Sequence, residues 1–121
     1  MNSAQRVLLA TATVFALLAG TTARAQEWVT LESKDLLQYE LAQANTFNNA
    51  PAGLYIKHRS VFSTTFACTS KDFVMITGDD HVVNRALASV MLAMTTGRTM
   101  RFWVIGCHGN YIEAKNLMLI N

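Results

Sequence analysis

The chain has 121 residues, of which 51% are hydrophobic, and its 10 basic and 8 acidic residues give a formal net charge of +2 at pH 7. Arg6 and Arg24 account for this excess, so residues 26–121 contain equal numbers of acidic and basic side chains and no local run of Lys or Arg. Binding nucleic acid requires clustered cations that neutralise phosphates, and we therefore exclude nucleic acid as a partner.

The first 25 residues have the features of a secretory leader. Arg6 precedes an apolar run over residues 7–20, and Ala23-Arg24-Ala25 has the small-x-small pattern that a signal peptidase cleaves. The apolar run is shorter than the roughly 20 residues that span a bilayer, so we expect no membrane insertion. The sequence predicts a signal peptide over residues 1–25 and an exported protein, periplasmic or secreted, that begins at Gln26.

Residues 26–121 contain no repeat, linker or low-complexity segment, which predicts a single domain. The alternation of Leu37, Tyr39 and Leu41 with polar residues favours a strand over residues 37–44, although an amphipathic helix over Leu37 to Ala44 remains an alternative. Turn-forming residues follow at 45–53. Further extended segments are predicted over residues 53–57, 61–69 and 73–77, with the polar residues 70–72 as a break.

One segment, from about Asp80 to Thr96, is predicted to be a helix. Asp79 or Asp80 can cap its N-terminus, and Gly97 can adopt the left-handed conformation that ends a helix. The apolar residues that recur at helical spacing are Val83, Leu87, Val90, Met91 and Met94. We expect this face, both methionines included, to pack in the core.

Two strands are predicted after the helix. Met100, Phe102 and Val104 alternate with Arg101, Trp103 and Ile105, residues 106–110 can form a turn, and residues 111–120 are extended. Several strands, one helix and two more strands predict an α+β, mostly β domain or a closed barrel rather than alternating β-α-β units.

The two cysteines are Cys68 and Cys107. Export would place them in an oxidising compartment, so we predict that they form a disulfide, with two buried free thiols as the alternative. The bond would close a loop of about 40 residues and stabilise the domain by about 3–4 kcal/mol. Cys107 and His108 are adjacent, and neighbours on an extended strand point to opposite faces, which argues against a catalytic Cys-His pair.

The run from Arg85 to Trp103 resembles the helix, Thr-Gly turn and following strand of the small OB-fold B subunits of the subtilase cytotoxin and pertussis-like (typhoid) toxin families. Supporting segments are Glu27-Trp28 after the leader, Leu54-Tyr55-Ile56 and Phe66-Ala67-Cys68. The resemblance implies a five-stranded barrel around one helix, and we predict for this chain an OB-like barrel of five or six strands with one helix. It also implies a homopentameric ring that displays glycan-binding pockets, and a catalytic A-type partner subunit.

This chain also departs from the pattern of those subunits. Ile56 stands where they place a cysteine, and their C-terminal extension with its late cysteine pair is missing. Compared with the pattern of those subunits, Cys107 is expected to take over as the partner of Cys68. The sugar-contacting residues of the family lie in segments that do not align clearly with this chain, so none of them is transferred to this sequence.

The best candidates for ligand contact are Trp103, His108, Asn110 and Tyr111, around the turn between the last two strands. Aromatic faces stack on the apolar side of sugar rings, while Asn and His supply oriented hydrogen bonds, so these residues suit a shallow glycan pocket. The alternative is that Trp103 packs in the barrel or against a neighbouring subunit and that the turn has no ligand.

Neither a metal site nor a catalytic site is expected. His58, His81 and His108 lack metal-ligand spacing, and the carboxylates and serines match no catalytic motif. We therefore predict a non-enzymatic binding subunit without cofactor or metal, one that recognises glycans and forms a ring. The alternative is a stand-alone accessory protein, such as an inhibitor or envelope module, with no glycan binding.

Overall fold

The computed structural model describes residues 26–44 and 50–121, so the predicted signal peptide and part of the predicted 45–53 turn lie outside the described residues. The elements are β1 (Glu27–Glu32), the short 3-10 helix η1 (Ser33–Asp35), β2 (Leu36–Ala42), β3 (Gly53–His58), β4 (Ser70–Ile76), α1 (Asp80–Thr96), β5 (Thr99–His108) and β6 (Tyr111–Ile120).

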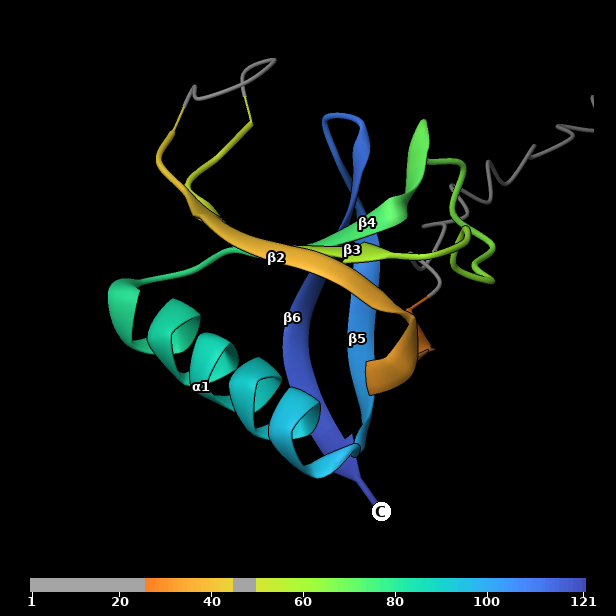
Figure 1. The fold of residues 1–121 in the computed structure, drawn as a ribbon. Coiled ribbons are helices and arrows are strands. Elements are labelled where there is room, and N and C mark those ends of the chain that lie inside the picture. Colours follow the sequence, from red (N-terminus) through yellow and green to blue (C-terminus); the bar gives the residue numbers. More distant parts are fainter. Residues whose placement is uncertain (1–25, 45–49) are drawn as a thin grey trace, which may run out of the picture.

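The strands of the described residues form one six-stranded sheet in the order β1-β5-β6-β4-β3-β2. Neighbouring strands are antiparallel except β4 and β6, which are parallel. The sheet is strongly bent, so that β2 and β3 run across β5 and β6, and α1 covers the open side between the two halves (Figure 1). This is the predicted α+β, mostly β, OB-like architecture with one helix.

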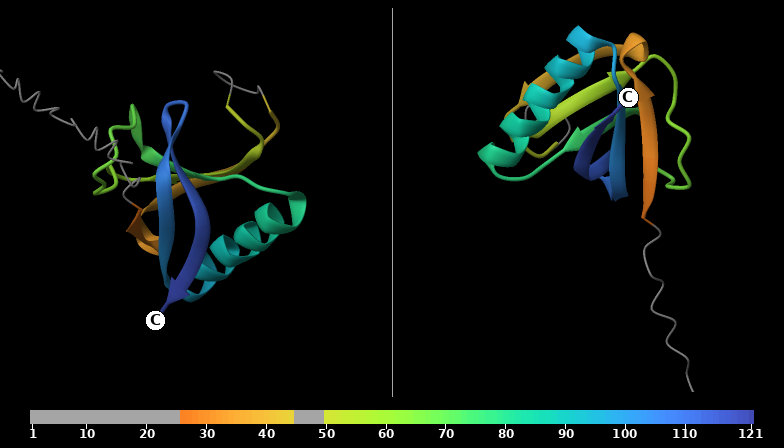
Figure 2. Two further views of the ribbon diagram at one scale, coloured as in Figure 1. Left: turned by 180° about the vertical axis from the view of Figure 1, so that it is seen from behind. Right: turned by 90° about the horizontal axis from the view of Figure 1, so that it is seen from below.

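The sheet does not close into a barrel. β1 and β2 are consecutive in the chain, but η1 turns the chain at a corner, so the two strands lie at opposite edges of the sheet and do not pair. β5 and β6 form a long hairpin whose turn lies at the end of the molecule remote from the C-terminus (Figure 2). Each edge strand therefore has one side without a strand partner in the described part of the chain.

The main core lies between the sheet and α1. The strands contribute residues that alternate along each strand, as predicted for β5, while the helix contributes small side chains. The fully buried members from the strands include Leu31, Leu54, Ile56, Val74, Met100, Phe102, Val104, Ile112 and Ala114. A second, smaller cluster of Ala50, Tyr55 and Met75 lies apart from this core.

Helix α1 has the predicted bounds and caps. The Asp79 side chain accepts a hydrogen bond from the Val82 backbone N–H at 2.9 Å, and Gly97 ends the helix with a φ of 72°. The prediction that Met91 and Met94 pack in the core is wrong, since their side chains are 51% and 47% exposed.

The buried residues of α1 are Ala86, Val90 and Ala93, and Val83 and Leu87 of the predicted face pack against the main core, as expected. The small buried side chains let the helix backbone approach the sheet closely, which turns the larger methionines to the flank of the helix. The sequence pattern could not show which part of this broad apolar face is buried, because Ala86 and Ala93 extend it on one side and Met91 and Met94 on the other.

The segment that could be strand or helix is the strand β2, so the helical alternative is wrong. Its apolar side is nevertheless exposed: Leu41 is 55% accessible, and Leu37 and Tyr39 are also exposed. Tyr39 and Leu41 lie opposite Ile56 and Leu54 of β3 and so share the core face of the sheet. They are exposed because β2 is an edge strand and α1 does not cover its side chains.

The predicted strand over residues 61–69 is also incorrect: this segment is a loop, and β4 begins at Ser70, within the residues expected to break the strand. Side-chain bonds hold the loop. The Glu27 carboxylate accepts hydrogen bonds from the Thr64 hydroxyl and from the backbone N–H of Thr65 at 2.8 Å. Burial alone would raise the pKa of Glu27, but these hydrogen bonds outweigh it and lower the pKa.

The predicted disulfide is present between Cys68 and Cys107, with a Cα–Cα distance of 5.5 Å. It links the 61–69 loop to the end of β5, and no free cysteine remains among the described residues. Within residues 26–44 and 50–121, no helix is long and apolar enough to cross a membrane.

Candidate functional site

The structure divides the four predicted ligand-contact residues between two places. His108, Asn110 and Tyr111 lie at the β5–β6 turn, where His108 and Tyr111 oppose each other and Gly109 has a φ of 57°. Trp103 lies opposite Asn116 in the middle of β5. It is separated from His108 by about 17 Å of extended strand and is not part of the turn.

Tyr111 belongs to an aromatic cluster rather than to a displayed surface. Its ring packs edge-on against Tyr55 at 5.5 Å and Phe73 at 5.6 Å, measured between ring centroids. The buried Tyr55 hydroxyl donates to the Pro51 carbonyl at 2.7 Å, and burial raises the pKa of Tyr55 to about 12. The half-buried Tyr111 therefore anchors the base of the hairpin to β3 and β4.

A polar cluster lies beside the same hairpin. The Glu113 carboxylate accepts hydrogen bonds from the Lys115 ammonium at 2.7 Å and the Thr77 hydroxyl at 2.9 Å, and His108 Nδ1 lies 3.6 Å from it. Burial alone would raise the pKa of Glu113, but these donors and the nearby positive charge lower it. Asn110 accepts a backbone hydrogen bond from Ser70 at 2.7 Å, and its exposed side chain stands at the tip of the turn.

Trp103 forms a different surface together with residues of β1. Its ring lies 5.0 Å from that of Trp28, which opposes it in the β1–β5 register, and Trp103 Nε1–H donates to Gln26 Oε1 at 3.1 Å. The Arg101 guanidinium lies 5.1 Å from the centre of the Trp28 ring. We call Gln26, Trp28, Arg101 and Trp103 the tryptophan surface. Both indoles are only half-buried.

The tryptophan surface points away from the core. Along β5, Met100, Phe102 and Val104 are buried against the helix side, so Arg101 and Trp103 project from the opposite side of the sheet. The surface offers aromatic faces, a guanidinium group and an amide on a rigid sheet. These groups can bind a ring with one apolar face and polar edges.

Sequence reasoning missed Gln26, Trp28 and Arg101 as members of this site. The alternation along residues 100–105 already placed Arg101 and Trp103 on one side of a strand. The position of Trp28, however, depends on pairing between β1 and β5, which are separated by most of the domain. In the described part of the chain, no group of three or more His, Cys, Asp or Glu residues is arranged to hold a metal ion.

Comparison of the chain with family models, curated proteins and solved structures finds no match. The resemblance to the toxin B subunits therefore stays a prediction from the sequence.

Proposed function

We propose that this protein is an exported, non-enzymatic binding subunit that recognises glycans through the tryptophan surface. The observation that carries the proposal is the pair of half-exposed indoles of Trp28 and Trp103, side by side on the outer side of the sheet. A pyranose ring has an apolar face that stacks on an indole, while its hydroxyl groups bond to donors such as Arg101 and acceptors such as the Gln26 amide.

Export is supported by the leader-like sequence of residues 1–25 and by the Cys68–Cys107 disulfide. Structural disulfides persist in oxidising compartments and are rare in the cytosol. A periplasmic or secreted location would also expose the protein to the glycans of cell surfaces.

Assembly into a ring of five copies forms part of the proposal, with a catalytic A-type subunit as partner. Its support is a set of exposed apolar residues, which we call the apolar flank: Leu37, Tyr39 and Leu41 of the edge strand β2, and Met91 and Met94 of α1. A hollow of about 530 Å³ lies at one end of this flank, between the end of β2 and the start of α1. Exposed apolar patches and open sheet edges of this kind mark protein–protein contacts.

A glycan array probed with the protein beginning at Gln26 tests the glycan proposal. Trp103→Ala should remove binding to the glycans that the wild-type protein captures, and Arg101→Gln should weaken it. His81→Ala, on the exposed start of α1, is the matched control and should bind normally. Unaltered binding by a folded Trp103→Ala variant would exclude the tryptophan surface as the glycan site.

Native mass spectrometry tests the assembly. A species of five subunit masses that dissociates in a Leu41→Lys variant supports the ring, because the substitution places a charge on the apolar flank. A wild-type monomer would instead support the stand-alone accessory protein. Glycan binding by a monomer would retain the recognition proposal and remove only the ring.

A further inference from the structure

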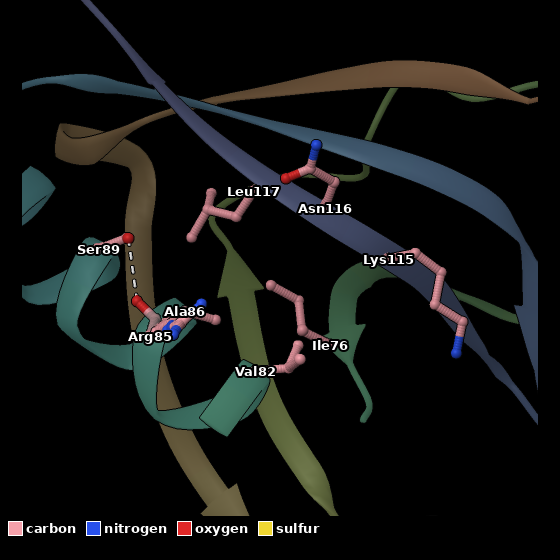
Figure 3. Close-up of a pocket in the computed structure, with 8 residues that line it drawn as sticks. All are labelled: Ile76, Val82, Arg85, Ala86, Ser89, Lys115, Asn116 and Leu117. Carbon is pink, nitrogen blue, oxygen red and sulfur yellow. Dashed lines mark hydrogen bonds between the residues drawn. The ribbon is translucent and has the colours of Figure 1, made fainter. Parts of the chain in front are cut away.

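A second groove lies between α1 and β6, on the side of the sheet that the helix covers. It has a volume of about 250 Å³ and opens to solvent. Figure 3 shows the side chains that line it, which are Ile76, Val82, Arg85, Ala86, Ser89, Lys115, Asn116 and Leu117. None of the residues that line the groove belongs to the tryptophan surface, although Asn116 at its border lies opposite Trp103 in the β5–β6 register.

The bottom of this groove is apolar. Ile76, Leu117 and Val82 converge on the space between the helix and β6 (Figure 3), and the buried Ala86 completes the contact. Ile76 is almost fully buried and Leu117 packs against the main core, so this floor belongs to the rigid part of the domain. Its shape is therefore largely formed before any ligand arrives.

One cation borders the groove without a neutralising partner. Arg85 is exposed, and within residues 26–44 and 50–121 its guanidinium makes no ion pair and no hydrogen bond. The Ser89 hydroxyl donates a hydrogen bond to the backbone carbonyl of Arg85 at 3.0 Å. This hydrogen bond does not involve the guanidinium. Within α1 the only carboxylate is Asp80, in the first turn, so no acid neighbours Arg85 along this flank.

The other basic residue of the groove is already neutralised. The Lys115 ammonium lies 2.7 Å from Glu113 and 3.2 Å from the Thr77 hydroxyl, and in Figure 3 it points away from the helix. The groove thus combines an apolar floor with a single uncompensated positive charge at its helix side. Its chemistry is that of an amphipathic site with one anion-binding group.

We propose that this groove binds a small amphipathic carboxylate, such as a medium-chain fatty acid. The carboxylate would pair with the planar guanidinium of Arg85, which matches the geometry of a carboxylate with two parallel hydrogen bonds. The hydrocarbon chain would lie against Ile76, Ala86 and Leu117 and displace water from the floor. The proposal is independent of glycan recognition because the two sites share no residue.

Titration of the ¹⁵N-labelled protein with sodium octanoate, followed by NMR, tests the proposal. We expect chemical-shift changes at residues 82–89 and 115–117, and weaker or no changes with octylamine, which carries the opposite charge. Sodium phosphate alone should bind more weakly than octanoate because it makes no contact with the apolar floor. Equal binding of octylamine, equal binding of phosphate, or shifts confined to other surfaces would overturn the proposal.

Arg85→Gln is the decisive variant. Loss of one charge-assisted pair should weaken octanoate binding by about tenfold or more, while Arg85→Lys, which keeps the charge but not the planar fork, should show a smaller loss. The matched control is Arg98→Gln, which removes an exposed arginine just after α1 and should leave the affinity unchanged. Wild-type affinity in Arg85→Gln, or an equal loss in Arg98→Gln, contradicts the assignment of the carboxylate to Arg85.

Discussion

The contribution of the disulfide to the free energy of unfolding can be measured with the double variant Cys68→Ala/Cys107→Ala. The bond joins residues 39 positions apart, so it restricts a large part of the unfolded chain. For a loop of that size, the chain-entropy relation gives a loss of about 4 kcal/mol at 25 °C when the bond is removed. This is a large fraction of the roughly 5–15 kcal/mol by which single domains are stable.

Changes in packing at the two substituted positions should alter the expected loss of free energy of unfolding only slightly. Cys107 is exposed, and Cys68 is 6% accessible at the edge of the main core, where alanine remains apolar and introduces no unpaired hydroxyl group. For a domain of this length, about 4 kcal/mol corresponds to a fall in melting temperature of about 15–30 °C. The variant should therefore still fold at low temperature.

Urea denaturation followed by the fluorescence of Trp28 and Trp103 is the assay. The variant should unfold at lower urea with a steeper dependence on denaturant, because its unfolded chain is less compact. A reductant should lower the wild-type midpoint to that of the variant and leave the variant unchanged. A loss of free energy of unfolding below about 1 kcal/mol would refute the reasoning, since it would show that the bond hardly restricts the unfolded chain.

Three further predictions concern single residues. Gly53→Ala would place a Cβ 2.5 Å from the backbone oxygen of Ile76, so it should lower the free energy of unfolding by about 2 kcal/mol or more in urea denaturation, and a neutral effect would contradict this contact. Asp79→Ala removes the N-cap of α1 and should cost about 1 kcal/mol by the same measurement, whereas the control Asp80→Ala should cost clearly less. The pKa of Glu113 is lowered from its usual 4.5, so its ionised form stabilises the fold above about pH 4.5 and this contribution is lost as the pH falls through the lowered pKa. The difference in free energy of unfolding between wild type and Glu113→Gln should therefore shrink as the pH falls below 4.5, and a constant difference would exclude the link.

Features that depend on neighbours along the chain were predicted well from the sequence. The helix bounds, the Asp79 cap and the Gly97 end rest on interactions within one or two turns. The strand after the helix followed from alternation over a few residues. The disulfide followed from there being only two cysteines in a chain with a leader-like start.

Features that depend on distant pairing were predicted poorly. The exposed Met91 and Met94, and the exposed apolar side of β2, follow from where the helix lies relative to the edge of the sheet. The loop over residues 61–69 has the composition of a strand, but Glu27 and the disulfide hold it outside the sheet. Among the residues of the tryptophan surface, the sequence analysis named only Trp103 as a candidate for ligand contact.

The amino-acid sequence alone determined the helix α1 with its two ends, the mostly β class and the covalent link between Cys68 and Cys107, because local periodicity and composition specify these features. The tertiary structure alone decided which part of the apolar face of α1 is buried and which aromatic residues meet. Trp28 and Trp103 are 75 positions apart and become neighbours only through the β1–β5 register. Such a register is set by the packing of the whole sheet against α1, and no short segment of the chain encodes it.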